Sequence, residues 1–267
     1  MTLPPAQHAE LERAVRLLES PHLAVRLANY AGKPLDRVLG AVPGLNGALH
    51  GAVRSAILRC LKVAIESQEG EPFAPSSWRP KALTGLTGGI GGLFGALALP
   101  IELPFTMMVM LRAIADIAHH HGEDMRSLEA RLACLQVFAL GDRRSDVGAA
   151  IGYYAARATL IKLTGDVMSS VVERSILDVS TPVVTRLVSE VVSRFGLVLT
   201  ERAAAGAIPV LGALGGATLN VIFMDHFERV AHGHFTLRRL ERRHGREAIG
   251  EYYRVAADGL TQAPAAP

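Results

Sequence analysis

The sequence predicts an all-α fold, a multi-helix bundle whose centre consists of two glycine-rich apolar helices or helical hairpins. Apolar residues recur at steps of three and four along most of the 267 residues, which is the spacing of a helix with one buried face. No alternation of apolar and polar residues continues for more than a few positions, so strands are not expected. Small residues supply much of the core, because 49% of the residues are hydrophobic and only 5% are aromatic.

Residues 1–68 are expected to form N-terminal amphipathic helices. One covers about residues 6–30 and is interrupted or restarted at Pro21, and the next covers about residues 46–68. The apolar positions at helical steps are Leu11, Val15, Leu18, Val25 and Ala28 in the first and Leu49, Val53, Ile57, Leu61 and Ile65 in the second. Residues 69–80 contain three prolines and mark a linker.

The core, expected at residues 81–258, contains two long runs without a charged residue, 82–101 and 203–224. Each exceeds the roughly 18 apolar residues of a membrane-span candidate, although glycine and proline dilute both. Residues of small size stand four apart at Gly88, Gly92 and Ala96, at Gly91 and Gly95, at Gly212 and Gly216, and at Gly47 and Gly51. Because this spacing lets two helices approach closely, the runs bury their surface either against each other or against a bilayer.

The rest of the core is expected to be helical as well. One helix covers residues 127–140. Its apolar side consists of Leu128, Leu132, Leu135 and Phe138. Residues 167–195 are rich in β-branched side chains, which favour strands, but their four-residue spacing predicts two helices that join near Pro182. A basic helical segment covers residues 234–255, and residues 259–267 are expected to be a disordered tail.

Composition restricts the compartment and the partners. The two cysteines, Cys60 and Cys134, lie in apolar helical patterns and are expected to be buried free thiols. Residues 1–12 lack the apolar segment of a secretory signal, so a cytoplasmic protein is expected. Lysine and arginine number 28 against 25 acidic residues, and the arginines are dispersed, so nucleic acid is not an expected partner.

Trp78, Arg79 and Lys81 stand directly before the first uncharged run. An aromatic residue beside cations at the start of an apolar segment is typical of a membrane interface. These three residues are therefore the membrane-interface candidates. The expected partner is a membrane surface or an integral membrane protein, which places the chain at the inner face of the cell membrane.

Glu102 is framed by Pro100 and Pro104 in apolar surroundings. A buried carboxylate must be paired, neutralised or bound to something. One interpretation is an ion pair with Arg112 or Arg157, and the other is a functional acid, a proton carrier or a metal ligand.

Histidines and acids offer a weak pattern for a metal. His119, His120 and His121 precede Gly122, where a role at a helix C-terminus is favoured over ligation. Asp225 and His232 lie on one helix face and could join Glu102 around an ion. The chain has neither a Glu-x-x-His repeat nor His-Glu-x-x-His, so no metal and no other cofactor is expected. Motifs for a nucleophilic serine, a phosphate loop or a dinucleotide are also missing, which favours a non-enzymatic protein.

Several patches in a fixed order resemble the EcsC family. They are the glycine-rich run 84–99, Ile101-Glu102-Leu103-Pro104, and segments 111–118, 122–124, 129–135, 137–141, 208–217, 223–227 and 233–235. The resemblance covers most of residues 78–245 and implies a membrane-associated or cytoplasmic bacterial protein, in a family named after a protein encoded beside an ABC transporter. It supplies no catalytic residue. The polar positions within the matching patches form the candidate polar cluster, Glu102, Arg112, Asp116, Asn220, Asp225 and His234.

Two functions are therefore expected from the sequence. The first is a peripheral membrane-associated or accessory helical protein without catalysis. The alternative is a soluble helical protein that binds an apolar ligand or a metal at the candidate polar cluster, which leaves room for an enzyme.

Overall fold

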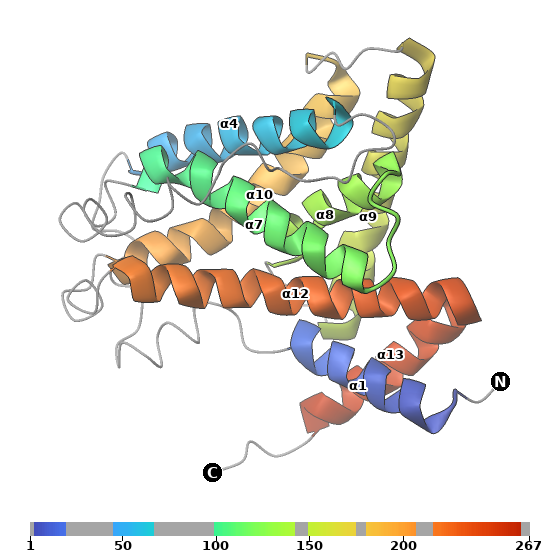
Figure 1. The fold of residues 1–267 in the computed structure, drawn as a ribbon. Coiled ribbons are helices and arrows are strands. Elements are labelled where there is room, and N and C mark those ends of the chain that lie inside the picture. Colours follow the sequence, from blue (N-terminus) through green and yellow to red (C-terminus); the bar gives the residue numbers. More distant parts are fainter. Residues whose placement is uncertain are drawn as a thin grey trace.

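The computed structural model describes residues 3–19, 45–66, 99–141, 149–174, 180–206 and 216–262. Within these ranges the chain forms eight helices and no strand, so the predicted all-α bundle is confirmed (Figure 1). The helices are α1 (Pro5–Leu18), α4 (Leu45–Glu66), α7 (Leu99–His120), α8 (Leu128–Leu140), α9 (Ala149–Arg174), α10 (Pro182–Gly206), α12 (Gly216–His244) and α13 (Arg246–Gln262).

Helix α8 is the centre of the bundle. The Ser127 hydroxyl caps it by accepting a hydrogen bond from the Ala130 amide at 3.2 Å. Every residue from Ala130 to Leu140 is buried, because α4, α7, α9, α10 and α12 pack around the helix. The sequence assigned α8 a single apolar side, but all its sides are covered. The helix contains no glycine, and the expected glycine-rich central helices fall largely outside the described residues.

Four phenylalanines join α8, α10 and α12, and we call them the phenylalanine cluster: Phe138, Phe195, Phe223 and Phe227. Their ring centroids lie 5.2 to 6.0 Å apart. All four side chains are excluded from solvent. Contacts of this kind supply specific ring geometry in addition to buried apolar area.

Among the glycines that the structure describes, two allow close approach, Gly141 and Gly233, and neither belongs to the predicted four-residue spacings. A Cβ atom on Gly141 would lie 2.6 Å from the Phe227 ring, and one on Gly233 would lie 2.6 Å from Leu18 Cγ. Gly233 therefore lets α1 lie directly on α12. A Cβ atom on Gly51 would meet no atom within 4 Å, so no tight contact depends on that glycine.

In the second half of the chain, four-residue spacing predicted helices although the β-branched residues favour strands, and the helices are confirmed. Residues 167–174 belong to α9 and residues 182–195 to α10, and Pro182 is the first residue of α10, where its missing N–H costs no helical hydrogen bond. The basic segment 234–255 is not one helix. It divides at Gly245, whose φ of 87° ends α12, and α13 then continues to Gln262, so residues 259–262 of the expected tail are helical.

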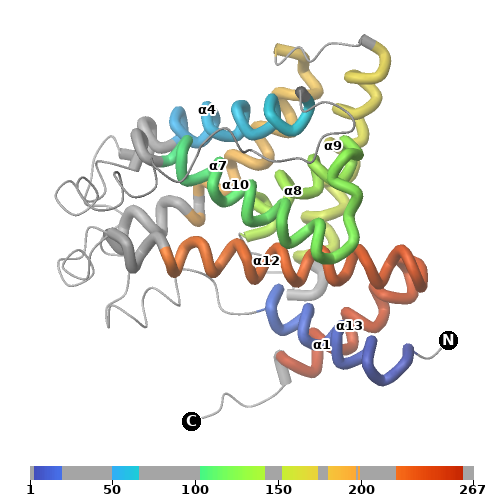
Figure 2. The backbone as a smooth tube through the Cα atoms, in the orientation of Figure 1, coloured from blue at the N-terminus to red at the C-terminus, as the bar shows by residue number. Residues whose placement is uncertain are grey.

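The bundle has two different ends, which Figures 1 and 2 show at the left and the lower right. Helices α4, α7 and α12 begin at the left, where α10 ends. Helices α1 and α13 pack on each other and on the second half of α12 at the other end. In the described part of the chain, no helix combines the length and the apolar character needed to cross a membrane.

Both cysteines are buried and free, as predicted. Cys60 lies on α4 with its Sγ 3.7 Å from the sulfur of Met108 on α7. Cys134 lies on α8.

Candidate functional site

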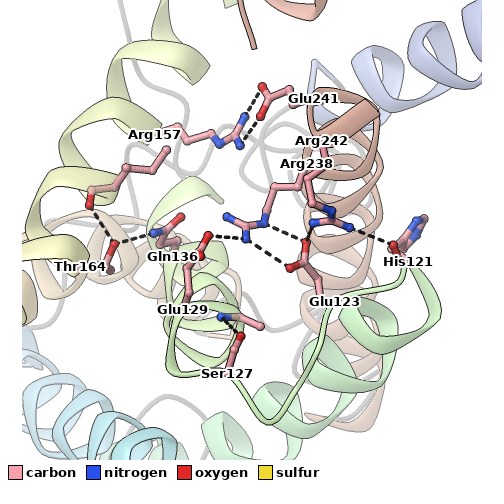
Figure 3. A network of polar contacts seen from close by, with 12 residues as sticks. His121, Glu123, Ser127, Glu129, Gln136, Arg157, Thr164, Arg238, Glu241 and Arg242 are labelled. Carbon is pink, nitrogen blue, oxygen red and sulfur yellow. Dashed lines mark hydrogen bonds and ion pairs between the residues drawn. The ribbon is translucent and has the colours of Figure 1, made fainter. Parts of the chain in front are cut away.

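The second half of α12 presents a row of polar side chains to the rest of the protein (Figure 3). His234, Arg238 and Arg242 stand four residues apart, and Glu241 stands three residues after Arg238, so all four lie on one broad side of the helix. Their partners come from α9 and from the connection between α7 and α8. We call this set, with its partners Tyr153, Arg157 and Glu123, the α12 network.

The turn after α7 places Glu123 in this network. Gly122 has a φ of 81°, its amide donates to the His119 carbonyl at 2.9 Å, and the Glu123 amide donates to the Ala118 carbonyl at 3.0 Å. This pair of hydrogen bonds is a Schellman motif, which explains why a glycine follows the histidines. The Glu123 side chain, 5% exposed, then points back toward α12.

Two arginines of α12 enclose the Glu123 carboxylate. Arg238 donates from Nε at 2.9 Å and from Nη2 at 3.2 Å, and Arg242 donates a further hydrogen bond. Burial alone would raise the pKa of Glu123, but the hydrogen bonds and charges of Arg238 and Arg242 outweigh it and hold that pKa below its ordinary value. Arg238 also donates to Glu129 at the start of α8, at 3.0 Å. The turn and α12 are therefore tied by ionised groups.

A second ion pair joins α9 to α12. Both terminal nitrogens of Arg157 donate to Glu241, each at 2.6 Å, and the Tyr154 hydroxyl donates to the same carboxylate at 3.2 Å. The Arg157 and Glu241 side chains are only 3% and 8% exposed. Burial opposes the charge on Arg157, but Tyr153 and Glu241 more than offset it and raise the pKa of Arg157. A two-pronged, buried pair of this kind fixes geometry more than it adds stability.

The third component of the α12 network is His234, whose side chain is completely buried. Its Nδ1 lies 3.0 Å from the Tyr153 hydroxyl. Burial, and next the charges of Arg157 and Arg238, hold the pKa of His234 well below its ordinary value, so the ring is neutral. Tyr153 in turn stacks on Tyr253 of α13, with ring centroids 5.4 Å apart.

These contacts define what the α12 network can do. Its charged groups pair with one another, and Glu123, Arg157, Glu241 and His234 are all less than a tenth exposed. Two buried nitrogens of the network, Nε of Arg157 and Nε2 of His234, have no hydrogen-bond partner. A substrate has no direct approach to such groups in this conformation. The arrangement instead holds α9, α12 and the turn before α8 in one fixed relation.

The structure places the described members of the candidate polar cluster in three different surroundings. Arg112 and Asp116 are exposed on α7. Asp225 accepts a hydrogen bond from Arg229 one turn later, at 2.9 Å. His234 lies in the α12 network. The side chains of Glu102 and Asn220, and the whole of the interface candidates Trp78, Arg79 and Lys81, lie outside the described residues.

The suggested partners also differ from those observed. Arg157, offered as a partner for Glu102, is engaged by Glu241. His232, a metal candidate with Glu102 and Asp225, has its Nδ1 3.1 Å from Nε2 of His121. Among the residues that the structure describes, no group of three or more histidines, cysteines or carboxylates is placed to hold a metal ion.

Sequence reasoning missed Glu123, Arg157, Arg238 and Glu241 as a connected set. The spacing of the polar residues on α12 was a usable signal, and so was the single arginine in the apolar stretch that begins α9. No local pattern in the sequence could predict which residues pair, because Glu123 and Arg238 are 115 positions apart in the chain.

A model described as the EcsC protein family matches residues 71–240, well over half of the chain. The chain belongs to the EcsC protein family. No curated protein matches it, and neither does any solved structure. The EcsC region contains Glu123, Arg157, Arg238 and His234, whereas α1, α4 and α13 lie outside it. The EcsC part of this chain thus includes most of the α12 network, and the flanking helices cover it.

Proposed function

We propose that this EcsC protein is a peripheral, non-enzymatic accessory protein. It docks on a membrane surface, or on an integral membrane protein, through the end of the bundle at which α7 and α12 begin. The arrangement of the helices carries the proposal. The uncharged runs 82–101 and 203–224 lead into α7 and connect α10 to α12, and these helix ends lie on the same side of the molecule (Figure 1).

The contrast between the two ends supports a docking direction. At the far end, Glu10 of α1 forms an ion pair with Arg239 of α12 at 2.7 Å, and the Tyr253 hydroxyl of α13 donates a hydrogen bond to Glu19, directly after α1. At the near end, Val221 in the first turns of α12 is 67% exposed. A protein whose long uncharged runs adjoin one end and whose ion pairs lie at the other has a natural orientation at an apolar boundary, with the ionic end in water.

The closed α12 network supports a scaffold rather than a catalyst. Catalytic acids and bases must reach the reacting atoms, at about 3 Å or through one water molecule. The titratable groups of the α12 network face each other instead, and their hydrogen bonds fix the helices that carry the uncharged runs. The alternative, an apolar ligand or a metal held at the candidate polar cluster, has less support, because the described members of that cluster lie in separate surroundings.

Flotation with anionic vesicles tests the proposal. The purified full chain is expected to rise with vesicles of phosphatidylglycerol and phosphatidylethanolamine in a density gradient. Val221→Glu places a charge at the proposed docking end and is expected to lower the bound fraction several-fold, because a charge is costly in the apolar region of a bilayer. Val255→Glu is the matched control, since Val255 is 65% exposed on α13 at the other end.

Two results would contradict the proposal. One is a wild-type chain that stays at the bottom of the gradient and in the soluble fraction of cells. The other is equal loss of binding in both variants, which would show that the end of the bundle does not matter.

A further inference from the structure

Two histidines meet where the end of α7 crosses α12. His121 Nε2 and His232 Nδ1 form a hydrogen bond of 3.1 Å, and the two rings are inclined to each other at 73°. His121 is half-buried and His232 is exposed. The contact bridges residues 111 positions apart, and the α12 network described above makes no use of it.

Both rings favour the neutral form, which is the form that binds metal ions. Burial lowers the pKa of His121 to about 4, with added contributions from the charges of Arg239, His232 and His120. Burial also lowers the pKa of His232. Each imidazole therefore keeps a nitrogen lone pair at neutral pH. In this hydrogen bond one of the two facing nitrogens carries the proton. If His232 donates it from Nδ1, an ion binds once that proton moves to Nε2 of the same exposed ring, while His121 keeps its proton on the buried Nδ1.

We propose that His121 and His232 bind a divalent transition-metal ion, such as Zn²⁺, as a two-imidazole clip between α7 and α12. Two nitrogen ligands of one tetrahedral Zn²⁺ ion lie about 3.3 Å apart, given bonds of about 2.0–2.1 Å, and the observed separation is 3.1 Å. Imidazole is a preferred ligand of zinc, copper and nickel. Water completes the coordination, because the structure places no third histidine, cysteine or carboxylate of the described residues at this point.

The surrounding charges permit a dication at this position. Arg239 disfavours it, but that guanidinium is paired with Glu10 at 2.7 Å. Glu228 lies one turn before His232 on α12, and its charge favours a cation at His232. With two protein ligands and open positions, the site is built for reversible binding rather than for a permanent structural ion.

Calorimetric titration of the full, untagged chain with ZnCl₂ at pH 7.5 tests the clip. One Zn²⁺ per chain is expected, and His232→Ala is expected to weaken binding by at least about tenfold. His119→Ala is the matched control, because His119 is an exposed histidine of the same triplet, and it should leave binding unchanged. MgCl₂, whose ion prefers oxygen ligands, should not bind.

A second measurement shows whether His232→Ala loses zinc binding because it folds poorly. Zn²⁺ at about a hundredfold excess over its Kd should raise the Tm of the wild-type chain by roughly 5 °C, and it should raise the Tm of His232→Ala by at most about half as much. Absence of binding by the wild-type chain would overturn the proposal. So would equal Zn²⁺ binding by the wild-type chain and His232→Ala.

Discussion

The phenylalanine cluster and the α12 network both hold α12 against the other helices, but they do so by different physical means. The phenylalanine cluster joins α12 to α8 and α10 through rings whose burial is favourable in many relative positions. The α12 network joins the same helix to α9 and to the turn before α8 through hydrogen bonds of fixed direction. We infer that the first supplies most of the stability and the second selects one arrangement.

The largest expected effect comes from the phenylalanine cluster. Phe227→Ala removes a ring that touches Phe138, Phe195 and Phe223. It should lower the free energy of unfolding by about 3–5 kcal/mol, since a buried ring is lost and a cavity remains. Urea denaturation measures this loss. Val172→Ala, at a position that is 79% exposed, should stay within about 0.5 kcal/mol of the wild type. A comparably small loss for Phe227→Ala would contradict the role given to the phenylalanine cluster.

The next largest effect tests whether the ion pair of Arg157 and Glu241 stabilises the fold or only selects one arrangement of the helices. Arg157→Ala leaves the Glu241 carboxylate buried without its two guanidinium donors, so it should cost about 3 kcal/mol in urea denaturation. The double variant with Arg157→Met and Glu241→Leu removes both charges and should lie close to the wild type. If the double variant were as unstable as Arg157→Ala, the ion pair itself would be a source of stability and the contrast with the phenylalanine cluster would fail.

The two regions also differ in how far sequence could predict them. Helix α10 follows from its four-residue spacing and from Pro182 at its start, and the Gly122 turn follows from the glycine after the histidines. These are local rules, which act within a few residues. They could not show that Glu123 faces Arg238, because that contact depends on how α7, α8 and α12 pack.

His234 illustrates the same limit for the candidate polar cluster. The sequence marks it as a polar residue within the ordered patches that resemble EcsC, which made a functional site a reasonable expectation. Its actual surroundings, with a Tyr153 partner and no exposure, are set by α9 and α13. A polar residue on an apolar helix face does not by itself reveal whether it meets a ligand or another helix.

A smaller effect tests how α1 is attached beside the α12 network. A Cβ atom on Gly233 would lie 2.6 Å from Leu18 Cγ and 3.1 Å from the Ala14 carbonyl oxygen, so Gly233→Ala must displace α1. A loss of about 1–3 kcal/mol is expected in urea denaturation. Gly51→Ala is the matched control on α4, where the new methyl group meets open space, and it should stabilise by about 0.5–1 kcal/mol through helix propensity. The same sign for both variants would contradict the close approach at Gly233.

The smallest expected effect, at alkaline pH, comes from the two buried thiols, Cys60 and Cys134, and we compare it with the effect of the α12 network. Burial raises the pKa of the Cys60 thiol on α4 from 9.0 to about 12, and it also raises the pKa of the Cys134 thiol on α8. The unfolded chain therefore releases these protons first, so stability is complete below pH 9 and declines as the pH rises above it. At pH 9.5 each thiol should lower the free energy of unfolding by about 0.8 kcal/mol relative to neutral pH.

The α12 network should contribute little to that decline, because the pKa of Arg157 is raised and its charge persists. Urea denaturation at pH 7.5 and pH 9.5 tests this, with Cys60→Ala as the comparison. The variant loses some stability at both pH values because a side chain is missing, but its change between them should be about half that of the wild type. An identical change in both proteins would contradict the role given to the buried Cys60 thiol in the alkaline decline.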